Sequence, residues 1–198
     1  MTIFNKIKWI LGVSMIFALI LTTNLIDRNN FVKVRDSVVA IYKDRLVADN
    51  LIFEISNSIH EKEIAIASSD TLFYSKRNKE INADIQGYIK RFEETKLTIK
   101  ENRVFKGFKN NFESLKAAEV TFVQSDFQTV SNQLSHIYNI KDNLQGLSII
   151  QLDEGGRQVA ISKKAISTVE LFTQIEIYVL VVIAIFIQIV IMYRPKER

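Results

Sequence analysis

Apolar residues gather in two long runs near the ends of this chain, Trp9 to Ile26 and Ile177 to Tyr193, and neither run contains a charge. Each is about 18 residues long, close to the length that an α-helix needs to cross a hydrocarbon core of roughly 30 Å. We therefore predict two transmembrane helices with a long polar segment between them. The predicted boundaries are a tail at 1–8, spans at 9–27 and 174–193, an intervening domain at 28–173, and a tail at 194–198.

Between the runs, apolar residues recur every three or four positions, which is the period of an amphipathic α-helix. The chain has one proline, Pro195, which follows the second run, and only six glycines, so few residues interrupt helices. The pattern predicts a first helix that continues out of the first span and ends at Ser68-Ser69-Asp70. Its buried seam is predicted to contain Phe31, Val34, Val38, Ile41, Arg45, Ala48, Ile52, Ile55, Ile59, Lys62 and Ile66.

Three further helices follow from the same period. The second and third are marked by Ile81, Ile85, Tyr88, Phe92 and Ile99, then by Phe105, Phe108, Phe112, Leu115 and Phe122, with a turn near Lys100-Glu101-Asn102. The fourth begins after the polar stretch 124–131 and runs into the second span. At 1.5 Å per residue the outer helices extend about 60 Å and the inner two about 35–40 Å. The predicted fold is all-α: an antiparallel up-down-up-down four-helix bundle whose first and last helices continue into two transmembrane helices.

Basic residues flank the outer ends of both apolar runs. Lys6 and Lys8 precede the first, and Arg194, Lys196 and Arg198 follow the second. Because Lys and Arg in short flanks are retained on the cytoplasmic side, both termini are predicted to be cytoplasmic and 28–173 to be external.

Each run has a competing interpretation. The first could be a cleaved signal peptide, but the residues from Thr22 to Ile26 lack an A-x-A-like cleavage pattern, which favours an uncleaved anchor. The second could be the buried core helix of a soluble domain. Tyr178 and Tyr193 stand at its edges, where interfacial aromatic residues are expected, so a lipid environment is favoured.

Composition argues against several function classes. The net charge of +4 is mild and the basic residues are dispersed, which disfavours nucleic acid as a partner. The chain has no cysteine and two histidines, His60 and His136, without carboxylates at metal-ligand spacing around both. Phosphate-binding glycine loops and hydrolase motifs are also missing from the sequence. We therefore predict a non-enzymatic protein with no catalytic residues, no metal site and no cofactor.

Polar residues interrupt the predicted seams of the first and fourth helices. Arg45 in the first helix and Gln151, Glu154 and Gln158 in the fourth fall at similar heights above the membrane if both helices enter the bilayer side by side. We expect a polar layer in which Arg45 faces Glu154, flanked by the two glutamines. Such a layer is either a small-ligand site or a salt bridge that fixes helix register and adds little stability.

Two other groups of residues complete the site predictions. Val34, Val38 and Ile41 lie low on the first helix, where the shorter inner helices cannot cover them, so they are the candidate dimer seam. Lys62, between Glu61 and Glu63, is interpreted as part of a solvated face.

The first predicted helix contains the stretch Ile41-Tyr42-Lys43-Asp44-Arg45-Leu46-Val47. With its Tyr-x-Asp-Arg-Leu motif and two flanking spans, the chain resembles the four-helix-bundle ligand-binding domain of bacterial chemoreceptors. The resemblance implies a periplasmic sensory domain in a bacterial inner membrane, dimeric through its first helix. Chemoreceptors follow the second span with a HAMP relay and a kinase-contacting coiled coil; here residues 194–198 follow it, so a sensor without HAMP or cytoplasmic signalling domain is expected.

The functional prediction is a non-enzymatic inner-membrane protein with a chemoreceptor-like periplasmic bundle, which passes ligand or partner binding to other membrane proteins. The alternative is a structural accessory subunit of a cell-envelope membrane complex. Expected partners are the lipid bilayer, a second copy or another membrane protein, and a small-molecule or periplasmic protein ligand.

Overall fold

The fold is known from a computed structural model that describes residues 3–128 and 130–192. The C-terminal tail, 194–198, and the first two residues of the N-terminal tail lie outside the described residues, so the predictions made for them stay predictions. The described elements, in chain order, are α1 (Ile3–Ala40), a π-helical segment η1 (Ile41–Leu46), α2 (Val47–Ala67), a second π-helical segment η2 (Phe73–Arg77), α3 (Asn78–Glu93), α4 (Ile99–Gln124) and α5 (Val130–Met192).

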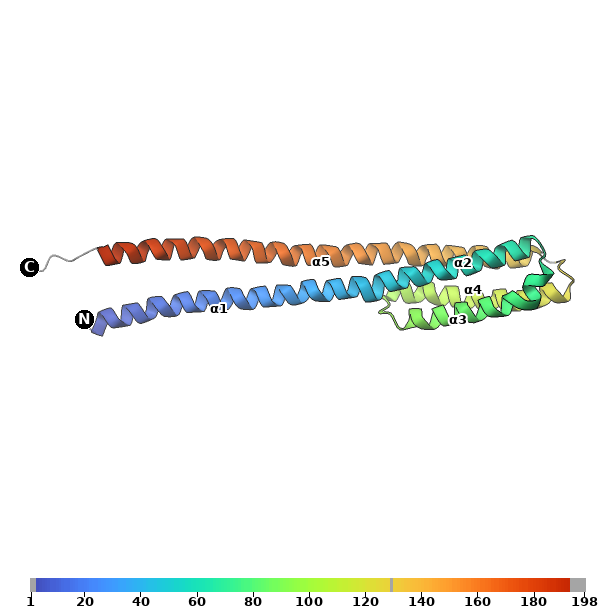
Figure 1. The fold of residues 1–198 in the computed structure, drawn as a ribbon, viewed down its shortest axis with the longest axis horizontal. Helices are drawn as coiled ribbons and strands as arrows, with labels where there is room; N and C mark the ends of the chain where they lie inside the picture. Colours follow the sequence, from blue (N-terminus) through green and yellow to red (C-terminus); the bar gives the residue numbers. More distant parts are fainter. Residues whose placement is uncertain (1–2, 129, 193–198) are drawn as a thin grey trace, which may run out of the picture. The chain divides into compact units, whose positions relative to one another are not determined.

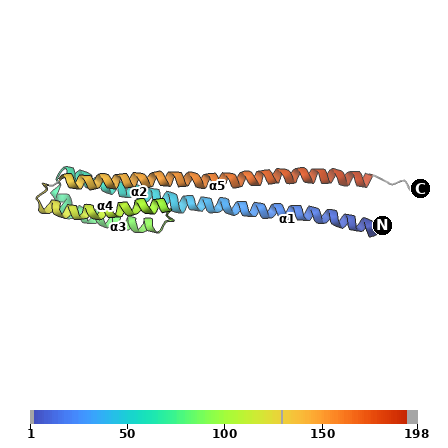
Figure 2. The ribbon, with the colours of Figure 1, turned by 180° about the vertical axis from the view of Figure 1, so that it is seen from behind.

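The chain divides into two compact units. One is Val39–Gln158, which we call the bundle unit; the other combines Met1–Val38 with Val159–Arg198 and is called the end unit. In the bundle unit, α2, α3, α4 and the first part of α5 lie side by side in both views (Figures 1 and 2). The prediction of an all-α four-helix bundle is confirmed, and the described residues contain no strand.

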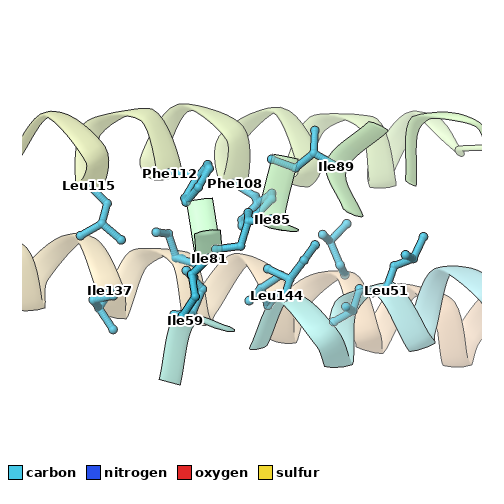
Figure 3. Packing of buried hydrophobic residues seen from close by; sticks show 14 of the residues in the cluster. Leu51, Ile59, Ile81, Ile85, Ile89, Phe108, Phe112, Leu115, Ile137 and Leu144 are labelled. Atoms are coloured by element: carbon cyan, nitrogen blue, oxygen red, sulfur yellow. The ribbon is translucent and has the colours of Figure 1, made fainter. Parts of the chain in front are cut away.

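A continuous apolar core fills the bundle unit, with contributions from all four helices. Figure 3 shows Leu51 and Ile59 of α2, Ile85 of α3, Phe108 of α4 and Leu144 of α5 converging on it. The phenylalanine stripe that marks the third predicted helix lies on α4 and is buried in this core. Its rings stack on one another, with centroids 5.9 Å apart for Phe105 and Phe108 and 6.3 Å apart for Phe108 and Phe112.

Local capping sets the ends of the helices. α2 ends at Ala67, just before the predicted Ser68-Ser69-Asp70 breaker, and the Asp70 carboxylate accepts a hydrogen bond from the Phe73 amide at 3.0 Å. The turn predicted near Lys100 instead occupies residues 94–98. Thr98 and Glu101 form a capping box that satisfies free amides at the start of α4, so the helix begins at Ile99, before the predicted turn, and Ile99 belongs to α4 and not to the helix before it.

The end unit consists of two helical segments, most of α1 and the C-terminal part of α5. Its α1 segment buries Asn30 and Ser37, whereas Phe31 and Val38 are 71% and 56% exposed. The predicted seam through Phe31 and Val38 is therefore wrong in this region. Val34 is half-buried as predicted, so the buried face of this segment runs through Asn30, Val34 and Ser37, and two polar side chains take the places expected for Phe31 and Val38.

One helix among the described side chains is long and apolar enough to cross a membrane, by length and composition alone, and it lies within Val130–Phe186. This agrees with the second predicted span. The first predicted span begins at residue 9, among residues whose side chains are not described, and it stays a prediction.

Candidate functional site

A buried charged residue, Arg45, lies in η1 at one end of the bundle core. Its Nη1 donates hydrogen bonds to Glu101 Oε1 at 2.6 Å and to Gln151 Oε1 at 3.0 Å, and its Nη2 donates to the Lys96 carbonyl at 2.9 Å. The Arg45 side chain is 10% exposed and that of Glu101 is fully buried. Arg45 therefore ties η1 to the α3–α4 turn, to α4 and to α5 through one guanidinium.

The Glu101 carboxylate is satisfied on both oxygens. Oε1 accepts from Arg45 and, at 2.6 Å, from Gln151 Nε2, while Oε2 accepts from the Thr98 amide at 2.6 Å. Hydrogen bonds of this kind offset the free-energy cost of removing the Glu101 carboxylate from water, whereas a buried ion without partners has no such compensation. One atom is left over: Arg45 Nε is buried and has no hydrogen-bond partner among the described residues.

The structure brings together two of the four residues predicted for this layer. Arg45 and Gln151 meet, but Glu154 does not face Arg45: its carboxylate binds Arg157, one turn further along α5, at 2.7 Å. Gln158 is half-buried and makes none of the layer's hydrogen bonds in the described part of the chain. The predicted pairing of Arg45 with Glu154 is wrong, and whether the layer binds a ligand stays a prediction.

Glu101 is the residue that the sequence reasoning missed. The prediction considered only the first and fourth helices as neighbours, whereas α4 presents its first turn to the same layer. A signal was present in the sequence: Thr98 followed three residues later by Glu101 is a capping-box pattern, which marks the start of a helix. That pattern would have placed Glu101 at the end of the bundle.

A second buried ion pair lies at the other end of the core. Lys62 Nζ is 2.7 Å from Glu119 Oε1 and also donates to the Asn78 side chain, and both charged side chains are almost completely buried. The interpretation of Lys62 as solvated is therefore wrong. Because α3 and α4 both supply partners, a cation in the middle of an apolar seam is held inside the bundle.

Burial changes proton affinities around this second pair. It lowers the pKa of the Lys62 ammonium below its usual range, against the opposing attraction of Glu119. It also raises the pKa of the neighbouring Tyr74 hydroxyl, an effect that the Glu119 charge reinforces. The Tyr74 oxygen is buried without a hydrogen-bond partner among the described residues, so the phenolate would be poorly solvated there.

A groove of about 440 Å³ runs along the outer face between α2 and α5. It is lined by Asp49, Ile52, Phe53, Ser56, Lys141, Leu144, Gln145 and Ser148. Of its two charged groups, Lys141 binds Glu63 at 2.6 Å, whereas the Asp49 carboxylate accepts a hydrogen bond from the neutral Ser148 hydroxyl at 3.3 Å. The Asp49 carboxylate is therefore the charged group of the groove that has no ion-pair partner among the described residues.

Metal binding has no support in the described part of the chain, where no three His, Asp or Glu side chains lie close enough together to hold an ion. The fold and its two buried ion pairs define an all-helical four-helix bundle. The chain matches the family described as a four-helix-bundle sensory module for signal transduction over residues 1–125, more than half of its length, and it belongs to that family. The resemblance to the chemoreceptor bundle is thereby confirmed. No curated protein and no solved structure matches the chain.

The family is a sensory signalling module rather than a catalytic one. Its match covers α1 to α4 and ends at residue 125, so α5, which supplies Gln151, lies beyond the matched region.

Proposed function

We propose that this protein is a non-enzymatic sensor of a bacterial inner membrane. Its bundle unit binds a ligand or protein partner outside the cytoplasm, and its two outer helices pass that event to other membrane proteins. The observation that carries this proposal is the continuity of α5. A single helix, Val130–Met192, contains both the core residues Leu144 and Leu147 and the apolar stretch that is long enough to span a bilayer.

The order of the cross-helix pairs supports an antiparallel up-down-up-down arrangement. From Glu63 back to Asp49 along α2, the partners on α5 advance from Lys141 to Ser148. Between α3 and α4, the pairs are Glu93 with Lys109 and Gln86 with Glu113, which again run in opposite directions. An even number of antiparallel helices returns the chain to the side from which it entered, as two spans with cytoplasmic termini require.

Topology is tested by cysteine labelling, for which the cysteine-free chain is well suited. A cysteine at the exposed Gln124 should react with a membrane-impermeant maleimide on cells whose outer membrane alone has been permeabilised. A cysteine at Lys196 should react only after the inner membrane is lysed. The opposite pattern would reverse the proposed orientation.

Self-association is proposed across the outer face of η1, α2 and α5. Tyr42, Leu46 and Phe53 on one side and Ile149 and Leu152 on the other are large apolar side chains left exposed in the bundle unit. Exposed apolar patches of this kind mark interaction sites, and a second copy is the partner that the chemoreceptor resemblance implies. The candidate dimer seam of Val34, Val38 and Ile41 remains a separate proposal.

Cysteine crosslinking tests directly whether a second copy of the chain packs against this face. Phe53→Cys should form a disulfide-linked homodimer in native membranes, whereas Lys79→Cys, an exposed site on α3, should not. Equal crosslinking at both positions would indicate random collision and contradict the proposed face.

The two candidate functions, sensor and scaffold, can be distinguished by whether a ligand raises the thermal stability of the protein. A ligand that binds only the native state raises the melting temperature by mass action. The full chain in detergent should therefore melt higher with at least one small molecule or periplasmic protein fraction. If none shifts the melting temperature while the Phe53→Cys dimer still forms, the structural accessory subunit becomes the better explanation.

A further inference from the structure

The groove between α2 and α5 lies wholly within the bundle unit and has a size suited to a small molecule. Its volume of about 440 Å³ falls within the roughly 300–1,000 Å³ of typical ligand pockets. It extends from Asp49 to Ser56 on α2 and from Lys141 to Ser148 on α5, a separation of seven residues on each helix. At the rise of an α-helix this is a length of about 10 Å. A molecule in the groove therefore contacts two helices that are far apart in the sequence.

The lining of the groove contains both covered and uncovered apolar surface. Ile52 and Leu144 are 5% and 2% exposed, and both belong to the core, in which Figure 3 shows Leu144. The Phe53 side chain is 59% exposed. An apolar group placed beside Phe53 removes ring surface from water, which is favourable.

The two charged groups of the groove lie at its opposite ends and differ in how they are neutralised. The Lys141 ammonium is 2.6 Å from the Glu63 carboxylate, so the charge at that end is balanced. At the other end, the Asp49 carboxylate accepts a hydrogen bond at 3.3 Å from the Ser148 hydroxyl, which carries no charge. The groove is thus left with one negative charge that no cation among the described residues neutralises.

Charge and shape together select one class of ligand. An ammonium group is complementary to the Asp49 carboxylate, and the Ser148 hydroxyl oxygen accepts a further hydrogen bond from it. A carboxylate next to that ammonium is repelled by Asp49, while Lys141 is about 10 Å away along the helix and already paired. A polyamine leaves all but one of its charges without a counter-ion. The class that fits is therefore a monoamine with an apolar body.

We propose that the groove between α2 and α5 binds a primary monoamine with an aromatic or branched aliphatic body. The ammonium lies at Asp49 and the apolar body lies against Phe53. The proposal rests on the proposed function and deepens it, because it names the class of ligand that the bundle unit senses. Phe53 also belongs to the face proposed for self-association, so the test changes Asp49 and leaves Phe53 unaltered.

Phenethylamine and isopentylamine are the probes, titrated into the full chain in detergent by isothermal titration calorimetry, with protein-free micelles as the blank. Both amines should bind. The isosteric anion 3-phenylpropionate, and phenylalanine, which adds a carboxylate, should bind at least about tenfold more weakly. At ten times its Kd, phenethylamine should raise the melting temperature by about 3 °C. Absence of binding by both amines, or equal binding by 3-phenylpropionate, would overturn the proposal.

A matched pair of variants tests the placement of the ammonium. Asp49→Asn preserves the size of the side chain and removes its charge, so it should weaken the binding of phenethylamine at least about tenfold. Asp84→Asn removes an exposed carboxylate of α3, outside the groove, and should change the affinity by less than about twofold, because such a distant charge is screened. Equal effects of the two variants would refute the assignment to Asp49. Thermal melts without amine establish that both variants are folded.

Failure of this proposal can be distinguished from failure of the proposed function. If neither amine binds while another small molecule or a periplasmic protein fraction raises the melting temperature, the sensor function stands and the ligand class is wrong. If no compound of any class raises the melting temperature, both proposals are wrong.

Discussion

From the burial of the Arg45–Glu101 pair we predict how much Glu101→Gln lowers the free energy of unfolding. Glu101→Gln removes the counter-charge but retains a side chain that can accept the Thr98 amide, so the capping box survives. The Arg45 guanidinium then keeps its bonds to Gln151 and the Lys96 carbonyl but remains charged in a site that is 10% exposed. Breaking one partner of a buried pair costs roughly 3–5 kcal/mol, a large share of the about 5–15 kcal/mol that typical domains possess.

Two companion variants separate charge from packing. The double replacement Arg45→Met with Glu101→Gln leaves no unpaired charge and should recover most of the loss, to within about 1–2 kcal/mol of the original chain. Glu154→Gln is the matched control. Its partner Arg157 is 57% exposed, and an exposed pair of this kind contributes at most about 1 kcal/mol.

The assay is urea unfolding of the full chain in detergent micelles, followed by far-UV circular dichroism. Changes in midpoint at constant slope give the differences in free energy of unfolding. If Glu101→Gln and Glu154→Gln destabilise equally, the layer is hydrated in solution and the reasoning from burial is refuted. If the double replacement is no more stable than Glu101→Gln alone, the loss comes from packing and not from the stranded charge.

Three further predictions concern the bundle core. Lys62→Met should destabilise by roughly 3–5 kcal/mol in the same unfolding assay, because it strands Glu119. Lys116→Met, which removes a half-buried lysine of α4 whose ion-pair partner Glu113 is exposed, should cost less than about 1 kcal/mol. Phe108→Ala should cost about 3–5 kcal/mol through the cavity that it leaves in a fully buried stack; a loss below 1 kcal/mol in urea melts would show that the site collapses or is not core. Tyr74 has a raised pKa when folded, so the unfolded chain releases this proton first: its contribution is present below the unfolded value of about 10 and is lost as pH rises beyond it. Tyr74→Phe should therefore flatten the alkaline fall in melting temperature, and an identical fall in both chains would contradict the assignment.

Much of this architecture follows from local patterns. Regular three-four spacing of Ile81, Ile85 and Phe92 predicts a helix whatever it packs against, because each turn of an α-helix returns to the same face. The scarcity of proline and glycine predicts that the helices are long, and the Phe105–Phe112 stripe predicts a core-facing side. The structure confirms all of these. The predicted start of α4 was wrong because it did not take into account the capping box of Thr98 and Glu101.

The two buried charges show where sequence reasoning failed. From sequence, Lys62 lies between two glutamates and looks solvated, while Arg45 has an acidic residue at the expected height on the last helix. In the structure Lys62 pairs with Glu119 and Arg45 with Glu101, and both partners lie on α4, 57 and 56 residues away. No local pattern encodes such a pairing, because it depends on which helices become neighbours and at what height.

The sequence by itself determined the helical class, the apolar stretches, the core faces and the family resemblance, since these depend on residues within a few turns of one another. Tertiary structure alone decided which charge meets which, and which face of α1 is buried. The first is decided by packing, because a buried charge is stable only where a partner from another helix completes its hydrogen bonds. The second is decided by packing within the end unit, where Asn30 and Ser37 are buried and Phe31 and Val38 are exposed, against the preference that the apolar period alone predicts.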